Sequence, residues 1–341
     1  MKNKLLCSCI FVLKFLLISQ VTIAQWTKQK LETEASFRSI CAVSENIVWA
    51  GGSKGTILRT IDGGKNWQIL HPKDAESLDF RDIFGVDEKI AFAMSAGEAE
   101  KGNAKILKTT DGGKSWQTVF ETTEKGVFFD SMDFWNANEG LVFSDPIEGK
   151  LLIIKTLDAG KTWQKISPDK LPAMREGEAS FAASGNSLVV KGKNKAWIST
   201  QNRVFYSTDK GENWAFSETP FKSTQTSGVF GLHFYSEKDG IAVGGDYKNE
   251  KLITENAAIT HDGGKTWQAA TPTKPDGLKE ASWLLPNKKL LVIGPSGTGI
   301  SVDFGKTWEI IDEEKFHTMS CFGKTCWAIG GKGNLGKMKI K

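Results

Sequence analysis

The sequence has few of the residues that build metal centres. It holds five cysteines and four histidines in 341 residues, and none of them fall at the paired Cys/His spacings of a zinc or related site. Arginine and tyrosine are also scarce, with five and three copies respectively. We therefore expect no metal and no cofactor.

A strong net charge is missing too. The formal charge is +4, but Lys2, Lys4 and Lys14 fall in the first 24 residues, where there is no acidic residue. Residues 25–341 are left with a formal charge of only +1. Because nucleic-acid binding depends on an excess of positive charge, we expect no nucleic-acid partner.

Long apolar runs are confined to the N-terminus. A mostly apolar stretch runs from Leu5 to about Ile18, interrupted by Lys14, and a cleavage site of the type Thr22-Ile-Ala24 precedes Gln25. This pattern predicts a signal peptide over residues 1–24 and export to a bacterial periplasm, cell surface or medium. The alternative is an uncleaved anchor, which Lys14 disfavours. After cleavage we expect no membrane span. Attachment to the surface through another protein stays open.

Three cysteines remain beyond residue 24. Cys321 and Cys326 are predicted on consecutive strands across the Gly323–Thr325 turn, where an exported protein permits a disulfide. Whether the bond forms depends on the pairing register, which the sequence leaves open. Cys41 is expected to pack as a small apolar residue.

One tract recurs six times with the pattern [Ser/Thr]-x-Asp-x-Gly-x-[Thr/Ser/Asn]-Trp. The copies are Thr60–Trp67, Thr109–Trp116, Thr156–Trp163, Ser207–Trp214, Thr260–Trp267 and Ser301–Trp308. Their aspartates lie 49, 47, 51, 53 and 41 residues apart. Such a period indicates a repeated supersecondary unit.

The residues of the tract are those of a tight turn. Asp and Ser/Thr side chains bond to nearby backbone N–H groups, and glycine supplies a positive φ. A β-rich run lies on each side, as in Thr56–Thr60 and Trp67–Leu70, and two more runs precede them at Ser36–Val43 and Ile47–Gly51. Four strands per period is the composition of a β-propeller blade. We assign the six aspartates to the turns and not to calcium.

The tract resembles the BNR/Asp-box repeat of sialidases, xyloglucanases and sortilin-type receptors. The longer pattern Trp49–Gly52, Gly55–Leu58, Asp62–Gly64 and Trp67 is similar to the photosystem II assembly and stability factor family. The resemblance extends over essentially all of residues 25–341. It implies an all-β propeller and, from the assembly factors, a scaffold for partner proteins.

The ends of the chain predict seven blades, although there are six boxes. Three further runs follow Trp308, at Phe316–Phe322, Cys326–Gly330 and Leu335–Ile340, and no fourth run follows. The segment Gln25–Leu31 mimics Trp67–Leu70, so it is expected to supply the missing strand and close the ring. We predict one domain, a seven-bladed propeller over residues 25–341, and a monomer. In this register the GxGxxG match at Gly331–Gly336 is a turn between strands and not a nucleotide site.

Aligning the first strands of the blades predicts a ring of polar residues at one mouth of the channel. The strands are taken as Phe37–Ile40, Phe80–Ile83, Phe129–Met132, Glu178–Phe181, Val229–Leu232, Glu280–Trp283 and Phe316–Met319. The residues are Arg38, Arg81, Asp130, Glu178, Glu280 and His317, with Arg175 in the loop before Glu178. Paired arginines suit a carboxylate or another anion. The alternative is a ring of salt bridges that ties the blades together.

Two classes of function fit this ring. The first is a non-catalytic module that binds a protein or an anionic or glycan ligand through Arg38, Arg81, Arg175 and His317. The second is a glycoside hydrolase of sialidase or xyloglucanase type, with Asp130, Glu178 and Glu280 as candidate catalytic carboxylates. The scarcity of arginine and tyrosine argues against the sialidase form, which needs three arginines and a tyrosine nucleophile.

Overall fold

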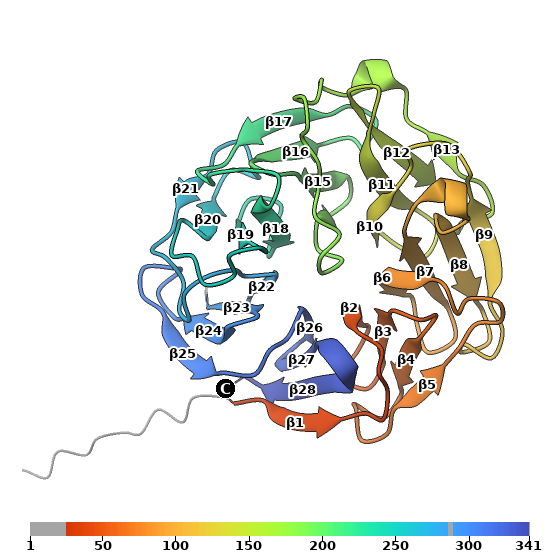
Figure 1. Cartoon of the computed structure of the whole chain (residues 1–341), viewed down its shortest axis with the longest axis horizontal. Helices are drawn as coiled ribbons and strands as arrows, with labels where there is room; N and C mark the ends of the chain where they lie inside the picture. Colours follow the sequence, from red (N-terminus) through yellow and green to blue (C-terminus); the bar gives the residue numbers. More distant parts are fainter. Residues whose placement is uncertain (1–24, 286–288, 341) are drawn as a thin grey trace, which may run out of the picture.

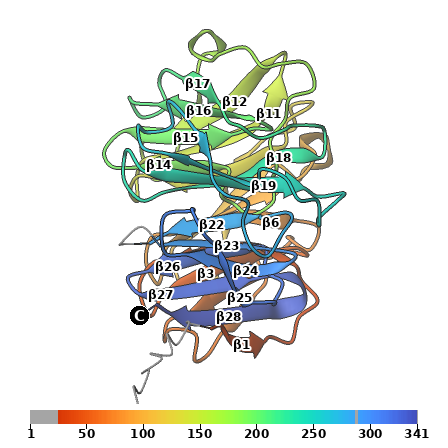
Figure 2. The same ribbon diagram turned by 90° about the vertical axis from the view of Figure 1, so that its left-hand side faces the viewer.

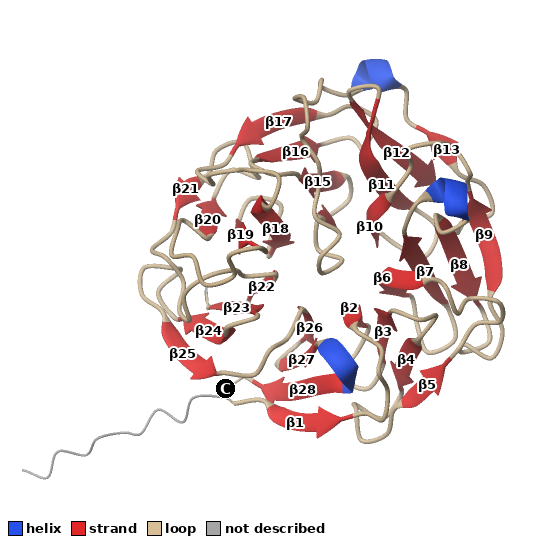
Figure 3. Cartoon of the chain, viewed as in Figure 1, coloured by secondary structure: helices blue, strands red, loops and turns tan. Residues whose placement is uncertain are grey.

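The protein is a ring of seven four-stranded antiparallel sheets. The computed structural model describes residues 25–285 and 289–340, so the predicted signal peptide lies outside the described residues. Figures 1 and 3 show the sheets arranged around a central axis, with only short single-turn helices. This confirms the predicted seven-bladed β-propeller. Among the described residues, no helix has the length and apolarity needed to cross a membrane.

Blades 1 to 3 each follow the chain from the inner strand outward. Blade 1 comprises β2 (Phe37–Ala42), β3 (Val48–Gly52), β4 (Ile57–Thr60) and β5 (Gln68–Leu70). Blade 2 comprises β6 (Asp79–Gly85), β7 (Ala91–Ala96), β8 (Lys105–Thr109) and β9 (Gln117–Glu121). Blade 3 comprises β10 (Phe129–Phe134), β11 (Gly140–Ile147), β12 (Lys150–Thr156) and β13 (Gln164–Lys165).

Blades 4 to 6 repeat this order. Blade 4 comprises β14 (Leu188–Lys191), β15 (Lys195–Ser199), β16 (Arg203–Ser207) and β17 (Ala215–Glu218). Blade 5 comprises β18 (Ser227–Phe234), β19 (Gly240–Asp246), β20 (Ala257–Thr260) and β21 (Gln268–Ala269). Blade 6 comprises β22 (Ala281–Leu284), β23 (Leu290–Gly294), β24 (Gly297–Ser301) and β25 (Glu309–Asp312).

Blade 7 is built from both ends of the chain, as the sequence predicts. Its strands β26 (Thr318–Phe322), β27 (Thr325–Ile329) and β28 (Asn334–Lys339) are completed by β1 (Thr27–Lys30), which pairs with β28 at the outer edge (Figure 2). Trp26 anchors this strand. Its ring packs edge-on against Phe316 at 5.4 Å, and its Nε1 donates to Oγ1 of Thr298 at 2.9 Å. Because the ring is closed, each blade packs between two neighbouring blades.

The six boxes share one set of turn hydrogen bonds. In the first, Oγ1 of Thr60 donates to Oδ1 of Asp62, and the N–H groups of Gly64 and Asn66 donate to Thr60 Oγ1 and Asp62 Oδ1, all at 2.9 Å. Equivalent bonds occur in the other five. The Asn66 bonds hold the pKa of Asp62 at about 2. The aspartates therefore stabilise turns, as predicted.

Large aromatic side chains pack between neighbouring blades and fix their spacing. Trp197 of blade 4 is fully buried and stacks on Phe234 of blade 5, with ring centroids 3.7 Å apart. Its Nε1 donates to the carbonyl of Gly263 in the blade 5 box at 2.8 Å. Because burial of aromatic area contributes strongly to packing, such contacts join each sheet to the next.

The structure also answers three smaller questions from the sequence. Cys321 and Cys326 are direct cross-strand partners on β26 and β27 and form a disulfide. Cys41 is free, and burial raises the pKa of its thiol to about 12. Residues Gly331–Gly333 form a single-turn helix between β27 and β28, so the GxGxxG match is a connection between strands.

The predicted inner strand of blade 4 is wrong. The strand is β14, Leu188–Lys191, and Glu178–Phe181 precede it in an irregular segment. We call residues Ala179–Ser187 the plug loop, because this segment enters the centre of the ring (Figure 1). Its composition, Ala-Ser-Phe-Ala-Ala-Ser-Gly-Asn-Ser, explains why: mostly small residues fit the narrow space between inner strands.

Candidate functional site

The plug loop is held in the channel by hydrogen bonds to its backbone carbonyls. Nη1 of Arg38 donates to the carbonyl of Ala183 at 3.0 Å, and Nη1 of Arg81 donates to that of Ala182 at 2.9 Å. These bonds come from the inner strands of blades 1 and 2. Buried carbonyls require partners, and the two arginines supply them on this side.

Other blades hold the rest of the loop. Oγ of Ser131 and Oγ1 of Thr318 donate to the carbonyls of Gly185 and Ser184, at 3.2 and 2.9 Å. The N–H of Leu232 donates to the carbonyl of Asn186 at 2.8 Å. The loop thus contacts inner strands around the ring. It separates a hollow at each mouth of the channel.

The first hollow, which we call the arginine hollow, has a volume of about 300 Å³. It is lined by Arg38, Arg81, Phe128, Asp130, Asp145, Ser180, Phe181, Ala182, Ala183, Phe230, Tyr247 and Glu280. Phe181 of the plug loop stacks on Phe230 of β18 with ring centroids 4.2 Å apart, and Tyr247 packs edge-on against Phe181 at 6.3 Å. Aromatic and charged side chains therefore line the same hollow, and we call the aromatic group Phe181, Phe230 and Tyr247 the aromatic wall.

Five of the seven predicted site residues meet at this mouth. Arg38, Arg81, Asp130 and Glu280 line the hollow. Glu280 joins two blades, because its Oε1 lies 3.3 Å from Nη1 of Arg38 and its Oε2 lies 2.6 Å from Nδ1 of His317. Both interpretations of the ring are thus partly realised: some charges pair with each other, and the same charges border a cavity.

Glu178 and Arg175 do not join this group. Glu178 is buried and forms an ion pair with Arg203, while Oγ1 of Thr200 donates to it at 2.5 Å. Arg175 forms a surface ion pair with Glu218. The alignment placed both at the mouth because it took Glu178–Phe181 as an inner strand. The segment instead turns towards the axis of the ring (Figure 1). Glu178, just before the plug loop, bonds to Thr200 and Arg203 of blade 4.

Asp130 differs from the other charged residues of the hollow. Its side chain is 1% exposed, and its Oδ2 is buried without a hydrogen-bond partner among the described residues. Burial, reinforced by nearby Asp145 and opposed by Arg81, raises the pKa of Asp130 well above its usual range. Burial also raises the pKa of Asp145, whose Oδ1 accepts the N–H of Ser180 at 3.1 Å.

Sequence reasoning missed the aromatic wall and Asp145. Phe230 occupies on blade 5 the position that Arg38 and Arg81 occupy on blades 1 and 2, where the alignment found no polar residue. An aromatic residue at that position was the available signal. Phe181 and Asp145 gave none, because they belong to a loop and a second strand whose paths the repeat does not specify.

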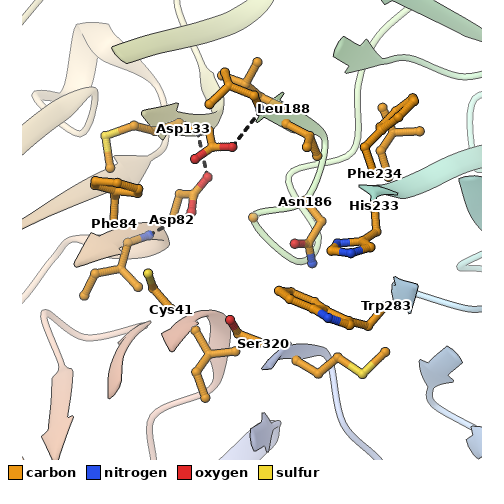
Figure 4. Close-up of a pocket in the computed structure, with 18 of the residues that line it drawn as sticks. Cys41, Asp82, Phe84, Asp133, Asn186, Leu188, His233, Phe234, Trp283 and Ser320 are labelled. Atoms are coloured by element: carbon orange, nitrogen blue, oxygen red, sulfur yellow. Dashed lines mark hydrogen bonds between the residues drawn. The ribbon is translucent and has the colours of Figure 1, made fainter. Parts of the chain in front are cut away.

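The opposite hollow lies at the mouth nearest the boxes (Figure 4) and has a volume of about 260 Å³. Asp82 and Asp133 enter it from β6 and β10, and burial raises their pKa values to about 8 and about 7. His233 stacks on Trp283 at 4.1 Å, and burial lowers its pKa to about 3. The aligned segments contained Asp82 and Trp283, but only the residue near each strand start was singled out there. Asp133 and His233 lie one residue beyond their aligned segments.

The two aspartates of this box-side hollow have structural partners. Oδ2 of Asp82 accepts hydrogen bonds from Oγ of Ser131 and from the N–H of Met132, both at 2.7 Å. Oδ2 of Asp133 accepts the N–H of Val190 at 2.7 Å. Each carboxyl therefore joins its own inner strand to the next blade. Among the described residues, no group of three or more His, Cys, Asp or Glu is arranged to hold a metal ion.

Comparisons with known proteins find similarity to BNR-type propellers over parts of the chain. A family model for the photosynthesis system II assembly factor YCF48 matches residues 86–179, and one for sortilin (neurotensin receptor 3) matches residues 152–289. No curated protein sequence matches significantly.

Solved structures with the same fold include binding proteins and enzymes. YCF48 bound to a D1 peptide is 16% identical with a TM-score of 0.67, over 93% of this chain and 97% of that one. YCF48 from Cyanidioschyzon merolae is 17% identical with a TM-score of 0.66, over 93% and 99%. A GH74 xyloglucanase from Xanthomonas campestris is 14% identical with a TM-score of 0.64, over 94% of this chain but 54% of that one. At these identities the likeness establishes the fold alone.

The buried Glu178–Arg203 pair yields a stability prediction. Glu178→Gln leaves a buried guanidinium without its counter-charge, so we expect a loss of about 3–5 kcal/mol in the free energy of unfolding. Glu139→Gln, which removes the more exposed pair with Lys210, is the control and costs about 1 kcal/mol or less. Chemical denaturation at pH 7 measures both.

The same pair gives a pH dependence. Burial acts to raise the pKa of Glu178, but the bonds from Arg203 and Thr200 outweigh it and hold the pKa below its usual value of 4.5. The stabilisation is therefore present above the unfolded-state pKa and is lost as pH falls through the lower, folded-state value. Equal losses for the Glu178→Gln and Glu139→Gln variants would contradict this account.

Proposed function

We propose that the chain is an exported, non-catalytic propeller that binds a carboxylate-bearing protein or ligand in the arginine hollow. The observation that carries the proposal is the pair of arginines on adjacent blades. The bonds described use Nη1 of both guanidinium groups and Nε of Arg81, which donates to Asp79 at 2.8 Å. Nη2 of each is left to donate to a ligand, and guanidinium N–H groups recognise carboxylates well.

The rim of the hollow suits a protein partner. Tyr247 begins the connection between β19 and β20, and this connection also exposes Leu252 and Ile253, whose side chains are 43% and 67% exposed. Tyr247 lines the hollow, and exposed large apolar side chains on the same connection are typical of interaction surfaces. The similar YCF48 propeller, solved with a D1 peptide, supports peptide binding by this architecture.

A glycoside hydrolase remains the second candidate, because two carboxyl groups do border one cavity. Asp130 and Glu280 both line the arginine hollow. The raised pKa of Asp130 suits a general acid. The similar xyloglucanase supports this alternative. Glu280, however, already contacts Arg38 and His317. Glu178 forms a buried ion pair with Arg203 and is not among the residues that line the hollow.

Export is proposed from the sequence of residues 1–24, which lie outside the described residues. The disulfide between Cys321 and Cys326 supports it, because disulfides persist in oxidising compartments.

Charge reversal tests the binding proposal. Arg38→Glu and Arg81→Glu each replace a guanidinium with a repelling carboxylate, so we expect each to weaken binding of 3-phenylpropionate by about tenfold or more. Isothermal titration calorimetry at pH 7 measures the affinity. Arg175→Glu, outside the hollow, is the control and is expected to bind like the wild type. Unchanged affinity in the first two variants would sink the proposal.

A glycan screen separates the hydrolase from the binding module. The purified protein is incubated with xyloglucan and sialyllactose, beside the Asp130→Asn and Glu280→Gln variants. The binding proposal expects no product from any of them. Turnover by the wild type that falls about 100-fold or more in both variants would instead establish hydrolysis at this hollow.

The export proposal is tested on the full chain expressed in a bacterium. We expect the secreted or periplasmic protein to begin at Gln25, as read by mass spectrometry. Lys14→Leu lengthens the apolar run and is expected to retain more of the chain in the membrane fraction. Intact residues 1–24 on a cytoplasmic wild-type protein would be the contrary result.

A further inference from the structure

Asp130 carries a buried carboxyl group beside the arginine hollow. It lies on β10 with 1% of its side chain exposed, and its Oδ2 has no hydrogen-bond partner among the described residues. An unpaired buried polar atom destabilises the folded state, and such atoms are rare in folded proteins. Because Asp130 lines the hollow, a donor on a bound ligand would supply the missing partner.

A second carboxyl lies beside it, and the arginine that interacts with Asp130 also bonds to other groups. Asp145, on the neighbouring strand β11, also lines the hollow and interacts electrostatically with Asp130. Arg81 interacts electrostatically with Asp130, but its Nε is bonded to Asp79 and its Nη1 to the plug loop. The other charged groups that line the hollow, Arg38 and Glu280, pair with each other. Positive charge is therefore lacking at the Asp130 end.

We propose that Asp130 and Asp145 form a subsite for an ammonium group, so that the ligand of the arginine hollow is zwitterionic. Its carboxylate would lie at the free N–H groups of Arg38 and Arg81, and its ammonium at Oδ2 of Asp130. This proposal rests on the function proposed above and narrows it.

The wall of the hollow specifies the rest of the ligand. Phe181 and Phe230 stack face to face, and Tyr247 closes the same side. Aromatic surfaces of this kind favour an apolar or aromatic group. A volume of about 300 Å³ accommodates a ligand of single amino-acid size. The geometry thus fits a free α-amino acid with a large apolar side chain.

Proton release gives the subsite a distinctive signature. Burial and Asp145 favour the protonated form of Asp130, whereas a bound ammonium favours the ionised form. Binding of an amine must then expel a proton, and its affinity must rise as pH increases through the pKa of Asp130. Binding of a carboxylate alone has no such requirement.

Three probes with the same phenyl group test the two ends of the site independently. L-Phenylalanine carries both charged groups, 2-phenylethylamine carries only the ammonium, and 3-phenylpropionate carries only the carboxylate. Calorimetric titrations at pH 5.5, 6.5 and 7.5, in buffers of different ionisation enthalpy, count the protons released. We expect the affinity for L-phenylalanine to be about tenfold or more above that for 2-phenylethylamine or 3-phenylpropionate, each of which lacks one of its two charged groups. We expect 2-phenylethylamine to release a proton and to bind more tightly at higher pH, and 3-phenylpropionate to do neither.

Asp130→Asn tests the residue directly, since asparagine keeps the shape and removes the charge. We expect this variant to bind L-phenylalanine with an affinity about tenfold or more below that of the wild type and to release no proton on binding. Its affinity for 3-phenylpropionate is expected to be at least as high as that of the wild type. Asp133→Asn is the matched control, because Asp133 is on the same strand but faces the box-side hollow. It is expected to bind all three probes like the wild type, with melting curves confirming that both variants fold.

The outcomes distinguish this inference from the function on which it rests. If 3-phenylpropionate binds through the arginines but L-phenylalanine binds no more tightly and releases no proton, the ammonium subsite is overturned and the anion site stands. If no probe binds, both are overturned. Should Asp130→Asn fail to fold, the proton count and pH trend of the wild type decide the question.

Discussion

The hydrogen bonds between the plug loop and the inner strands are the constraint on which the candidate site depends. An irregular segment inside a protein must find partners for its backbone carbonyls, and here the partners are side chains of the strands around it. Arg38 and Arg81 satisfy Ala183 and Ala182. The same guanidinium groups border the arginine hollow, so the loop both orients them and forms part of the wall against which a ligand would lie.

The two mouths of the channel use aspartate in different ways. At the box side, Asp82 and Asp133 accept backbone N–H groups from neighbouring strands and blades, so their burial is compensated by bonds that hold the ring together. At the other mouth, Asp130 is 1% exposed, and its Oδ2 has no hydrogen-bond partner among the described residues. The contrast is informative because all three have raised pKa values, and only the bonding pattern separates a structural carboxyl from one open to a ligand.

The fold was predictable because it follows from local chemistry repeated along the chain. Each box fixes one turn, and Trp26 revealed the closing strand by its likeness to Trp67. Arg38, Arg81, Asp130 and Glu280 were found because equivalent positions on successive blades converge. Glu178 was misplaced for the opposite reason. The segment before β14 departs from the repeat, and its path is set by contacts with blades distant in sequence, such as Thr318 with Ser184, which no local pattern encodes.

Function in this propeller is therefore expected where the repeat is broken. A ring of seven similar strands offers similar positions to the channel, and symmetry alone gives little discrimination between ligands. The plug loop removes that symmetry. It brings Phe181 against Phe230 and engages Arg38 and Arg81 but no third arginine. The result is a hollow with a charged end, an aromatic side and an unsatisfied carboxyl, arranged asymmetrically about the axis. Because recognition requires several different groups at fixed relative positions, we expect ligand selectivity to depend on this inserted loop rather than on the shared blade architecture.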